Sequence, residues 1–263
     1  MMKTRIAALS VAGALVLGQM IDVSAAAQLS TQAIEIEASQ SLEWLSEQNA
    51  YVARGNAKLR QGDIVVSANT LTANYRDGSD GKTEIWQVVA VGNVRIATPT
   101  QQVSGDRGIY DVLSETFTLT GSDLRLETVN EVITARDSLE YSKSEQVAVA
   151  RGNARAVRGT DQIDADELKA ELSEATDGQM QIDNLAATGN VVITTLTDIA
   201  RGDHGLFNRQ TNTATLSGSV RLTRGENQLN GDFAEVNLDT GVSRLLSQPG
   251  TDGRVQGIFA PQQ

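Results

Sequence analysis

The chain has 263 residues, of which 40% are hydrophobic and 4% aromatic, with 23 Gly, 3 Pro, no Cys and one His. It is long enough to bury a sizeable core in one or two domains, and its composition excludes collagen-like, disulfide-rich and disordered chains. The formal net charge of −11 opposes the counterion release that drives nucleic-acid binding, so we expect no nucleic-acid partner.

The first 27 residues have the three parts of a secretory signal peptide. Lys3 and Arg5 form a basic start, Ile6 to Leu17 is an apolar run of 12 residues, and Ala25-Ala26-Ala27 is an A-x-A cleavage site. This run is too short to span a hydrocarbon core of about 30 Å. We expect residues 1–27 to be removed and the mature chain to work in an exported compartment. The alternative is an uncleaved inner-membrane anchor, which Asp22 weakens.

A Gly-Asn or Gly-Ser dipeptide recurs along the chain and marks an internal repeat. The dipeptides begin at Gly55, Gly92, Gly121, Gly152, Gly189 and Gly218. Each of the first three lies 97 residues before its counterpart among the last three, and residues 54–121 laid over 151–218 give 25 identities in 68 positions. We therefore predict two continuous blocks of repeats, residues 28–150 and 151–263. After Leu124 the register slips by one, which could mark a β-bulge.

The segments around these dipeptides alternate apolar and polar residues, which predicts β-strands with one buried and one solvent-facing side. Asp166 to Ala175 also fits a short helix, but it overlays a strand-like stretch of the first block, so we interpret it as a strand. Leu42 to Gln48 is the other short candidate helix. Turn signals such as Asp77-Gly78 and Asp177-Gly178 separate the strands. Because stacked strand repeats bury a continuous core, we expect an elongated antiparallel all-β body.

The predicted buried face consists of thin aliphatic side chains next to Gly or Ala. Two Trp, four Tyr and four Phe are the only aromatic residues available to fill the interior. Such a lining leaves room for an apolar guest between two sheets. The alternative is that the strands close over one another and the small residues permit tight packing.

A set of short motifs spans most of the chain: Ile34-x-Ile36-x-Ala38, A-x-G-N-V-x-I at Ala90–Ile96 and Ala187–Ile193, the G-D-x-x-x-Y/F turns at Gly105–Tyr110 and Gly202–Phe207, Leu216–Leu222 with the downstream Asn227-x-x-x-Gly231-Asp232, and the tail Gly253–Phe259. Together they resemble the OstA-like/LptA family of periplasmic lipopolysaccharide-export proteins. The similarity covers roughly residues 32–259.

The resemblance implies a folded-over antiparallel β-jelly-roll, or β-taco, in the periplasm. Its interior would carry the acyl chains of lipopolysaccharide from an inner-membrane extractor toward the outer-membrane assembly machinery. It also implies head-to-tail stacking with export components of the same fold, or with further copies of this chain. No Arg/Lys clamp for the anionic headgroup is evident, so we expect binding by acyl burial with the phosphates left in water.

Two sets of residues are expected to carry this function. The candidate groove residues face inward by strand parity: Val94, Ile96, Leu119, Leu126, Val191, Ile193, Leu216, Val220, Leu222 and Leu229, with Trp86, Phe117 and Phe233 added near turns. The candidate partner edges are Ile34 and Ile36 near the mature N-terminus, and Val255 and Phe259 near the C-terminus. An unpaired strand edge either aggregates or recruits a strand from a partner.

Catalytic and metal chemistry have little support in the sequence. His204 stands where the other block has Arg107, which favours a turn position over a catalytic role. The acidic cluster of Asp161, Asp164, Asp166 and Glu167 could bind Ca²⁺, but the spacing and Gly of an EF-hand are missing. We expect no enzyme, no cofactor and no metal site. The alternative to a lipid carrier is a structural or adhesive β-repeat protein with a fully packed interior.

Overall fold

The computed structural model describes residues 35–78, 83–174, 180–237, 239–240, 242–247 and 254–259. The predicted signal peptide and Ile34 lie outside the described residues. Among those described, no helix is long and apolar enough to cross a membrane.

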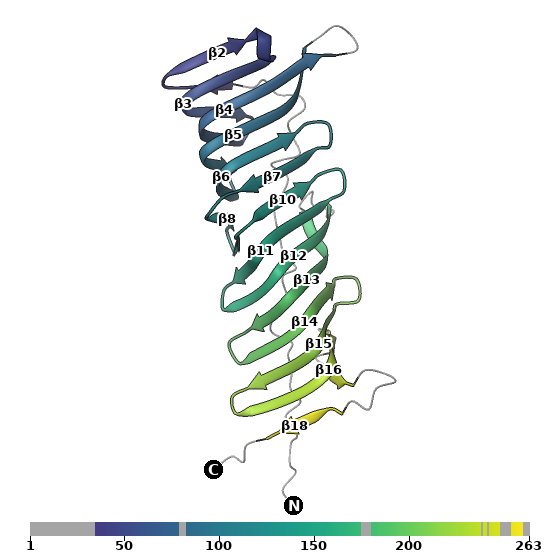
Figure 1. The fold of residues 1–263 in the computed structure, drawn as a ribbon. Helices are drawn as coiled ribbons and strands as arrows, with labels where there is room; N and C mark the ends of the chain where they lie inside the picture. The colour runs from purple at the N-terminus through teal and green to yellow at the C-terminus, as the bar shows by residue number, and fades with distance from the viewer. Residues whose placement is uncertain are drawn as a thin grey trace, which may run out of the picture.

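The described residues form one antiparallel sheet of 18 strands. The strands are β1 Glu35–Glu37, β2 Ser41–Leu45, β3 Ala50–Gln61, β4 Ile64–Asp77, β5 Thr83–Ala97, β6 Gln101–Asp111, β7 Thr116–Thr120, β8 Leu124–Thr128, β9 Glu131–Ala135, β10 Ser138–Ser142, β11 Val147–Arg158, β12 Asp161–Glu174, β13 Met180–Thr194, β14 Asp198–Asn208, β15 Thr213–Arg224, β16 Asn227–Asn237, β17 Val242–Leu246 and β18 Gln256–Ile258. From β3 to β6 and from β11 to β16, each strand pairs with the next along the chain. The strands stack as rungs of a long body (Figure 1). The predicted elongated antiparallel all-β architecture is confirmed.

The two candidate helices resolve differently. The strand interpretation of residues 166–175 is confirmed through Glu174, because β12 runs to that residue. The segment Leu42–Gln48 begins in β2 and ends in a single 3-10 turn, Ser46–Gln48. Through Glu174, where the description of the second segment stops, neither segment forms an α-helix.

A crease crosses the sheet where the Gly-Asn dipeptides lie. The pairing of β3 with β4 shifts register between Arg54 and Ala57, and Gly55 and Asn56 there have φ of +80° and +44°. Equivalent shifts occur at the dipeptides of β5, β11, β13 and β15. Gly and Asn are the residues that tolerate this left-handed region, and each bulge bends its strand. The bends turn one sheet into two facing layers.

Crowding at the crease explains why glycine occupies these positions. A Cβ built on Gly152 would lie 2.2 Å from Asp137 Oδ2, and one on Gly189 would lie 2.2 Å from Asp166 Oδ2. In both cases the carboxyl group of an aspartate, Asp137 between β9 and β10 or Asp166 in β12, occupies the space that a side chain on the glycine would need. Asn190 Nδ2 donates a hydrogen bond to the same Asp166 oxygen at 2.9 Å.

Three local expectations are corrected at the crease. The extra residue of the first block lies before Leu124, in the 121–123 break between β7 and β8, rather than after it. The segments Gly105–Tyr110 and Gly202–Phe207 are not turns but run inside β6 and β14. His204, expected at a turn, lies within β14 as well. A bulge lets these strands bend and continue where a turn would reverse the chain.

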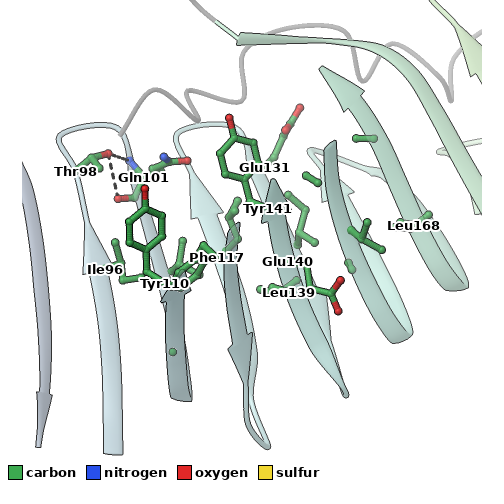
Figure 2. Close-up of a pocket in the computed structure, with 18 of the residues that line it drawn as sticks. Ile96, Thr98, Gln101, Tyr110, Phe117, Glu131, Leu139, Glu140, Tyr141 and Leu168 are labelled. Carbon is green, nitrogen blue, oxygen red and sulfur yellow. Dashed lines mark hydrogen bonds between the residues drawn. The ribbon is translucent and has the colours of Figure 1, made fainter. Parts of the chain in front are cut away.

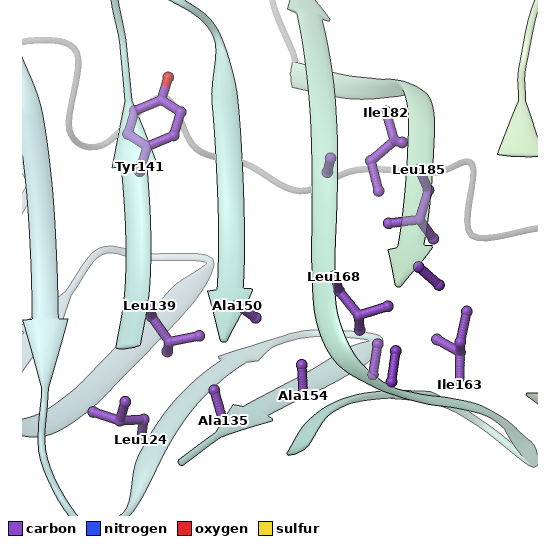
Figure 3. Close-up of a cluster of buried hydrophobic side chains, with 14 of the residues drawn as sticks. Leu124, Ala135, Leu139, Tyr141, Ala150, Ala154, Ile163, Leu168, Ile182 and Leu185 are labelled. Carbon is purple, nitrogen blue, oxygen red and sulfur yellow. The ribbon is translucent and has the colours of Figure 1, made fainter. Parts of the chain in front are cut away.

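The core follows the crease between the two layers. Its most deeply buried large side chains are Leu119, Leu124, Val94, Val191 and Val220, each at most 1% exposed. Figure 3 shows the middle of this cluster, where side chains from both layers converge. Thin aliphatic residues and alanines fill most of the interior, as the alternation predicts.

Candidate functional site

A cavity of about 250 Å³ lies between the two layers in the middle of the sheet. Its lining runs from Leu59 in β3 to Leu185 in β13, and aliphatic or aromatic side chains make up most of it (Figure 2). A space that holds one water needs only about 10–15 Å³ on this measure, so the interior here is not closed by tight packing.

Five of the predicted groove residues lie at this cavity. Ile96, Phe117 and Leu126 line it directly. Val94 and Leu119 are buried beside it, because a Cβ on the lining residue Gly108 would lie 3.5 to 3.6 Å from Phe117, Val94 and Leu119.

The other predicted groove residues lie elsewhere. Val191, Ile193, Leu216, Val220 and Leu222 are buried in the core cluster and Leu229 packs against it, but none of the six lines this cavity. Trp86 and Phe233, by contrast, do not belong to the core cluster.

Local geometry accounts for these two aromatic residues. Trp86 is the unpaired residue where β4 and β5 shift register between Asn74 and Tyr75. Phe233 pairs with Ser217 and alternates with the buried Ala234, so it faces away from the core. The alternation of inward and outward side chains therefore cannot be extended across a bulge or to the end of a strand.

The partner-edge residues lie at the two ends of the sheet. Ile36 in β1 is 36% exposed, and β1 pairs only with the far half of β3 among the described strands. Val255 and Phe259 flank β18 and are 45% and 67% exposed. β18 pairs with β16 through Gln228–Asn230.

Polar residues gather at the edge of the cavity away from the crease. Gln101 and Glu131 are the first residues of β6 and β9, and Tyr110 and Tyr141 lie near the far ends of β6 and β10. Both tyrosine hydroxyls point toward the side where Gln101 and Glu131 lie (Figure 2). We call Gln101, Tyr110, Glu131 and Tyr141 the polar rim.

One turn, used three times, builds this rim and its counterpart in the second half of the chain. Backbone N–H groups of Gln101 and Glu131 donate to the hydroxyls of Thr98 at 3.2 Å and Thr128 at 3.0 Å. The same turn joins Thr195 to Asp198 at 3.0 Å. Each turn places an acidic or amide residue at the start of the strand that follows: Gln101 in β6, Glu131 in β9 and Asp198 in β14. The repeated Thr-x-x-Gln/Glu/Asp spacing is the sequence signal that could have found these residues.

The ionised carboxylate of Asp198 has hydrogen-bond donors on both of its oxygen atoms. Arg224 donates to both carboxylate oxygens at 2.5 and 2.7 Å, and Thr197 donates at 2.7 Å. Burial works against ionisation, but these hydrogen bonds outweigh it and lower the pKa of Asp198. This carboxylate is a structural anchor for the ends of β14 and β15.

Glu131 occupies the equivalent position without such a partner. It pairs in register with Arg158 as Asp198 pairs with Arg224, yet Arg158 Nε lies 3.9 Å from Glu131 Oε1. The residue is 4% exposed, and burial raises its pKa to about 7 while Arg158 opposes the shift. Its Oε1 accepts no hydrogen bond within the described chain. Leaving such an acceptor unsatisfied costs about 1–3 kcal/mol.

The rest of the rim is equally poor in partners. Gln101 Oε1 is also buried and accepts no hydrogen bond from the described residues. Burial raises the pKa of the Tyr110 and Tyr141 hydroxyls, and the carboxylate of Glu115 adds to both shifts, so they stay protonated donors at neutral pH. The rim thus presents two buried oxygen atoms without a hydrogen bond from the described residues, Gln101 Oε1 and Glu131 Oε1, and two tyrosine hydroxyl donors to the cavity.

Residues of the acidic cluster contact other groups of the chain. Asp164 binds Arg155 Nε at 2.5 Å, Glu167 is paired with Arg151, and Asp166 lies over Gly189. In the part of the chain that the structure describes, no three His, Cys, Asp or Glu residues come together in a way that could hold a metal ion.

Comparison with known proteins places the chain in a family. The model of the family described as LptA/(LptD N-terminal domain) LPS transport protein matches residues 35–137 and again residues 133–242. The chain belongs to this family. The resemblance seen in the motifs is thereby confirmed, and the protein's function is related to lipopolysaccharide transport.

Two individual proteins are similar to this LptA/LptD-type chain. An uncharacterised protein of Rhizobium meliloti is 30% identical over 144 residues, which cover 53% of this chain and 76% of that protein. The crystal structure of LptH, the LptA-homologous periplasmic component of the lipopolysaccharide transport device of Pseudomonas aeruginosa, aligns with 12% identity and a TM-score of 0.22 over 88% of this chain and 96% of that one.

Proposed function

We propose that this protein is a periplasmic carrier that binds lipopolysaccharide by its acyl chains and passes it from the inner toward the outer membrane. The observation that carries the proposal is the apolar cavity between the two layers, in a chain of a lipopolysaccharide-transport family. Each CH₂ group taken out of water into such a lining gains about 0.8 kcal/mol. The role is one of binding and transfer without covalent chemistry.

Charge supports binding by the acyl chains alone. The net charge of −11 gives no long-range attraction to an anionic headgroup, and the lining contains no Lys or Arg. The phosphates would therefore stay in water outside the rim. A carrier that leaves the headgroup solvated also releases its cargo more easily than one that clamps it.

The ends of the sheet support a bridging arrangement. β1 at one end and β18 at the other present exposed apolar residues, Ile36 and Phe259 among them. A partner with the same fold could continue the sheet at either end by strand addition. We propose export components at the two membranes, or further copies of this chain, as those partners.

A fully packed structural protein is the second candidate. It is favoured by the second half of the core, where Val191 and Val220 are each 1% exposed and do not line the cavity. If the protein is a carrier, the acyl chains bind in the cavity in the middle of the sheet. The packed second half of the sheet then only lengthens the protein.

Native mass spectrometry of protein from the exported compartment tests the proposal. We expect a co-purifying mass of the lipid A type, lost in Ile96→Asp because a charge then enters the cavity lining. Arg95→Asp is the matched control, since the neighbouring Arg95 is exposed on the other side of the strand. A folded wild-type chain that stays empty after incubation with lipopolysaccharide would support the packed structural protein instead.

A further inference from the structure

The polar rim combines groups that an acyl chain without substituents cannot satisfy. Gln101 Oε1 and Glu131 Oε1 are buried acceptors at the edge of an apolar cavity, and Glu131 is 4% exposed. The ester carbonyls and hydrocarbon of a plain acyl chain contain no hydrogen-bond donor. Such a chain would leave both acceptors unpaired.

The chain itself shows what a satisfied rim position looks like. Asp198, equivalent to Glu131, has Arg224 and Thr197 as donors. Arg158 stands in register with Glu131, but its Nε lies 3.9 Å away, beyond hydrogen-bond distance. Gln101 stands in register with Thr128, whose hydroxyl is already used in its own turn. All the buried acceptors that accept no hydrogen bond in the described chain lie in its first half, and two of them, Gln101 Oε1 and Glu131 Oε1, belong to residues that line the cavity.

Other polar groups near the cavity do not fill this need. Glu140 is engaged outside the rim, where Ser138 Oγ donates to it at 2.7 Å and Arg151 Nε at 3.3 Å. Figure 2 shows its carboxyl pointing away from the tyrosine hydroxyls. Tyr110 and Tyr141 offer donors from the opposite layer, so the rim presents donors on one side and acceptors on the other.

We propose that the rim selects acyl chains that carry a hydrogen-bond donor near their head end, a hydroxyl or an amide N–H, over unsubstituted ester-linked chains. The donor would meet Gln101 or Glu131, while the carbonyl beside it accepts from Tyr110 or Tyr141. The apolar remainder fills the cavity below. This inference rests on the proposed function and adds to it the means of distinguishing such lipids from ordinary phospholipids.

Two neutral probes that differ by one hydroxyl test the selection. Methyl myristate and methyl β-hydroxymyristate have the same chain, and their affinities can be measured by displacement of an environment-sensitive apolar dye from the full mature protein. One added hydrogen bond in place of an unsatisfied acceptor predicts about 3- to 10-fold tighter binding of the hydroxy ester. This comparison needs no variant and so does not depend on whether any variant folds.

Variants assign the preference to the rim. Gln101→Leu with Glu131→Leu removes both acceptors and should make the two affinities equal, whereas Glu131→Gln alone keeps an acceptor and should retain the preference. Gln102→Leu is the matched control, because Gln102 is exposed on the other side of the same strand. The β-sheet circular dichroism signal of each variant confirms its fold.

The outcomes separate this inference from the proposed function. If neither ester displaces the dye, acyl binding itself is refuted. If both esters bind wild type equally, or the plain ester binds better, acyl binding stands and the selection is wrong. If the leucine variant weakens both esters by the same factor and the preference persists, the rim shapes the cavity without recognising the hydroxyl, and the inference is overturned.

Discussion

Arg158 Nε lies 3.9 Å from Glu131 Oε1, whereas Arg224, at the equivalent position, lies 2.5 Å from the Asp198 carboxylate. In both pairs the carboxylate residue begins a strand and stands in register with an arginine that ends the neighbouring strand. One carboxyl is locked in an ion pair and the other faces the cavity with a pKa near 7. This difference between equivalent positions leads to the first two predictions.

Stability should fall as the pH rises through neutrality because of Glu131. Its pKa is about 7 in the folded chain against an ordinary 4.5, so the folded state binds the proton more tightly than the unfolded state. The stabilisation is present in full below pH 4.5 and is lost as the pH rises through 7, by about 3 kcal/mol at most. Urea unfolding between pH 5 and pH 8 should show this slope in wild type and lose it in Glu131→Gln. Glu127→Gln, an exposed change on the same hairpin, should keep it.

Removing the Asp198 carboxylate should destabilise the second half of the sheet. Asp198→Ala leaves Arg224 without its bidentate partner, and since Arg224 is 28% exposed we expect a loss of about 2–3 kcal/mol, below the 3–5 typical of a fully buried pair. Urea unfolding at pH 7 measures it. Glu226→Ala, which removes an exposed carboxylate in the turn after β15, serves as the control. A loss no larger than that of the control would mean that the ion pair contributes little.

A glycine of the crease, Gly152, should tolerate alanine less well than Gly159, which lies in the turn between β11 and β12. Gly152→Ala places a Cβ against the Asp137 carboxyl at a φ of +82°, whereas Gly159→Ala has a φ of +58° and nothing within 4 Å. Both substitutions lose about 1 kcal/mol of stability because alanine disfavours the left-handed backbone. Any further loss of stability at Gly152 therefore measures the contact of the new Cβ with the Asp137 carboxyl. We expect about 1–2 kcal/mol more at Gly152 in thermal or urea unfolding. Combining it with Asp137→Ala should recover most of that difference; no recovery would place the strain elsewhere.

Filling the cavity should stabilise the fold and weaken ligand binding. Ala148 lines the cavity, so leucine there occupies empty space and should raise the free energy of unfolding by about 1 kcal/mol while reducing binding of an apolar dye. Ala186→Leu on the outer face is the control. In a packed interior the same change would overfill the core and destabilise it by about 1–3 kcal/mol. The sign of the stability change therefore distinguishes the carrier from the packed protein.

Loss of the C-terminal edge should weaken self-association. Truncation after Gln248 removes β18, which pairs with β16 and carries Ile258 at 60% exposure. Sedimentation across a concentration series should show oligomers of the full mature chain and fewer of the truncated one. Phe259→Asp keeps the strand and tests the apolar contact by itself. Equal monomeric behaviour of all three would contradict stacking of this chain on itself.

Strand content and direction could be read from local sequence. Alternation with a period of two is a property of each strand alone, which is why β12 was correctly assigned through Glu174 despite a helix-like composition. The Gly-Asn spacing likewise revealed the repeat, because only Gly and Asn readily adopt the backbone of each bulge. The sequence could not tell whether these bulges reverse the chain or bend it, so Gly202–Phe207 was wrongly expected to be a turn.

Local sequence patterns are enough to predict a stack of alternating β-repeats and a resemblance to a lipopolysaccharide-transport family. They do not show where the interior stays open or which polar groups face the opening. Ile96 and Val191 have the same inward parity, yet one lines the cavity and the other is 1% exposed in the core. The cavity depends on the distance between the two layers. The rim depends on whether an arginine comes within hydrogen-bond distance of the carboxylate on the neighbouring strand. Those distances are set by the packing of residues far apart in the chain.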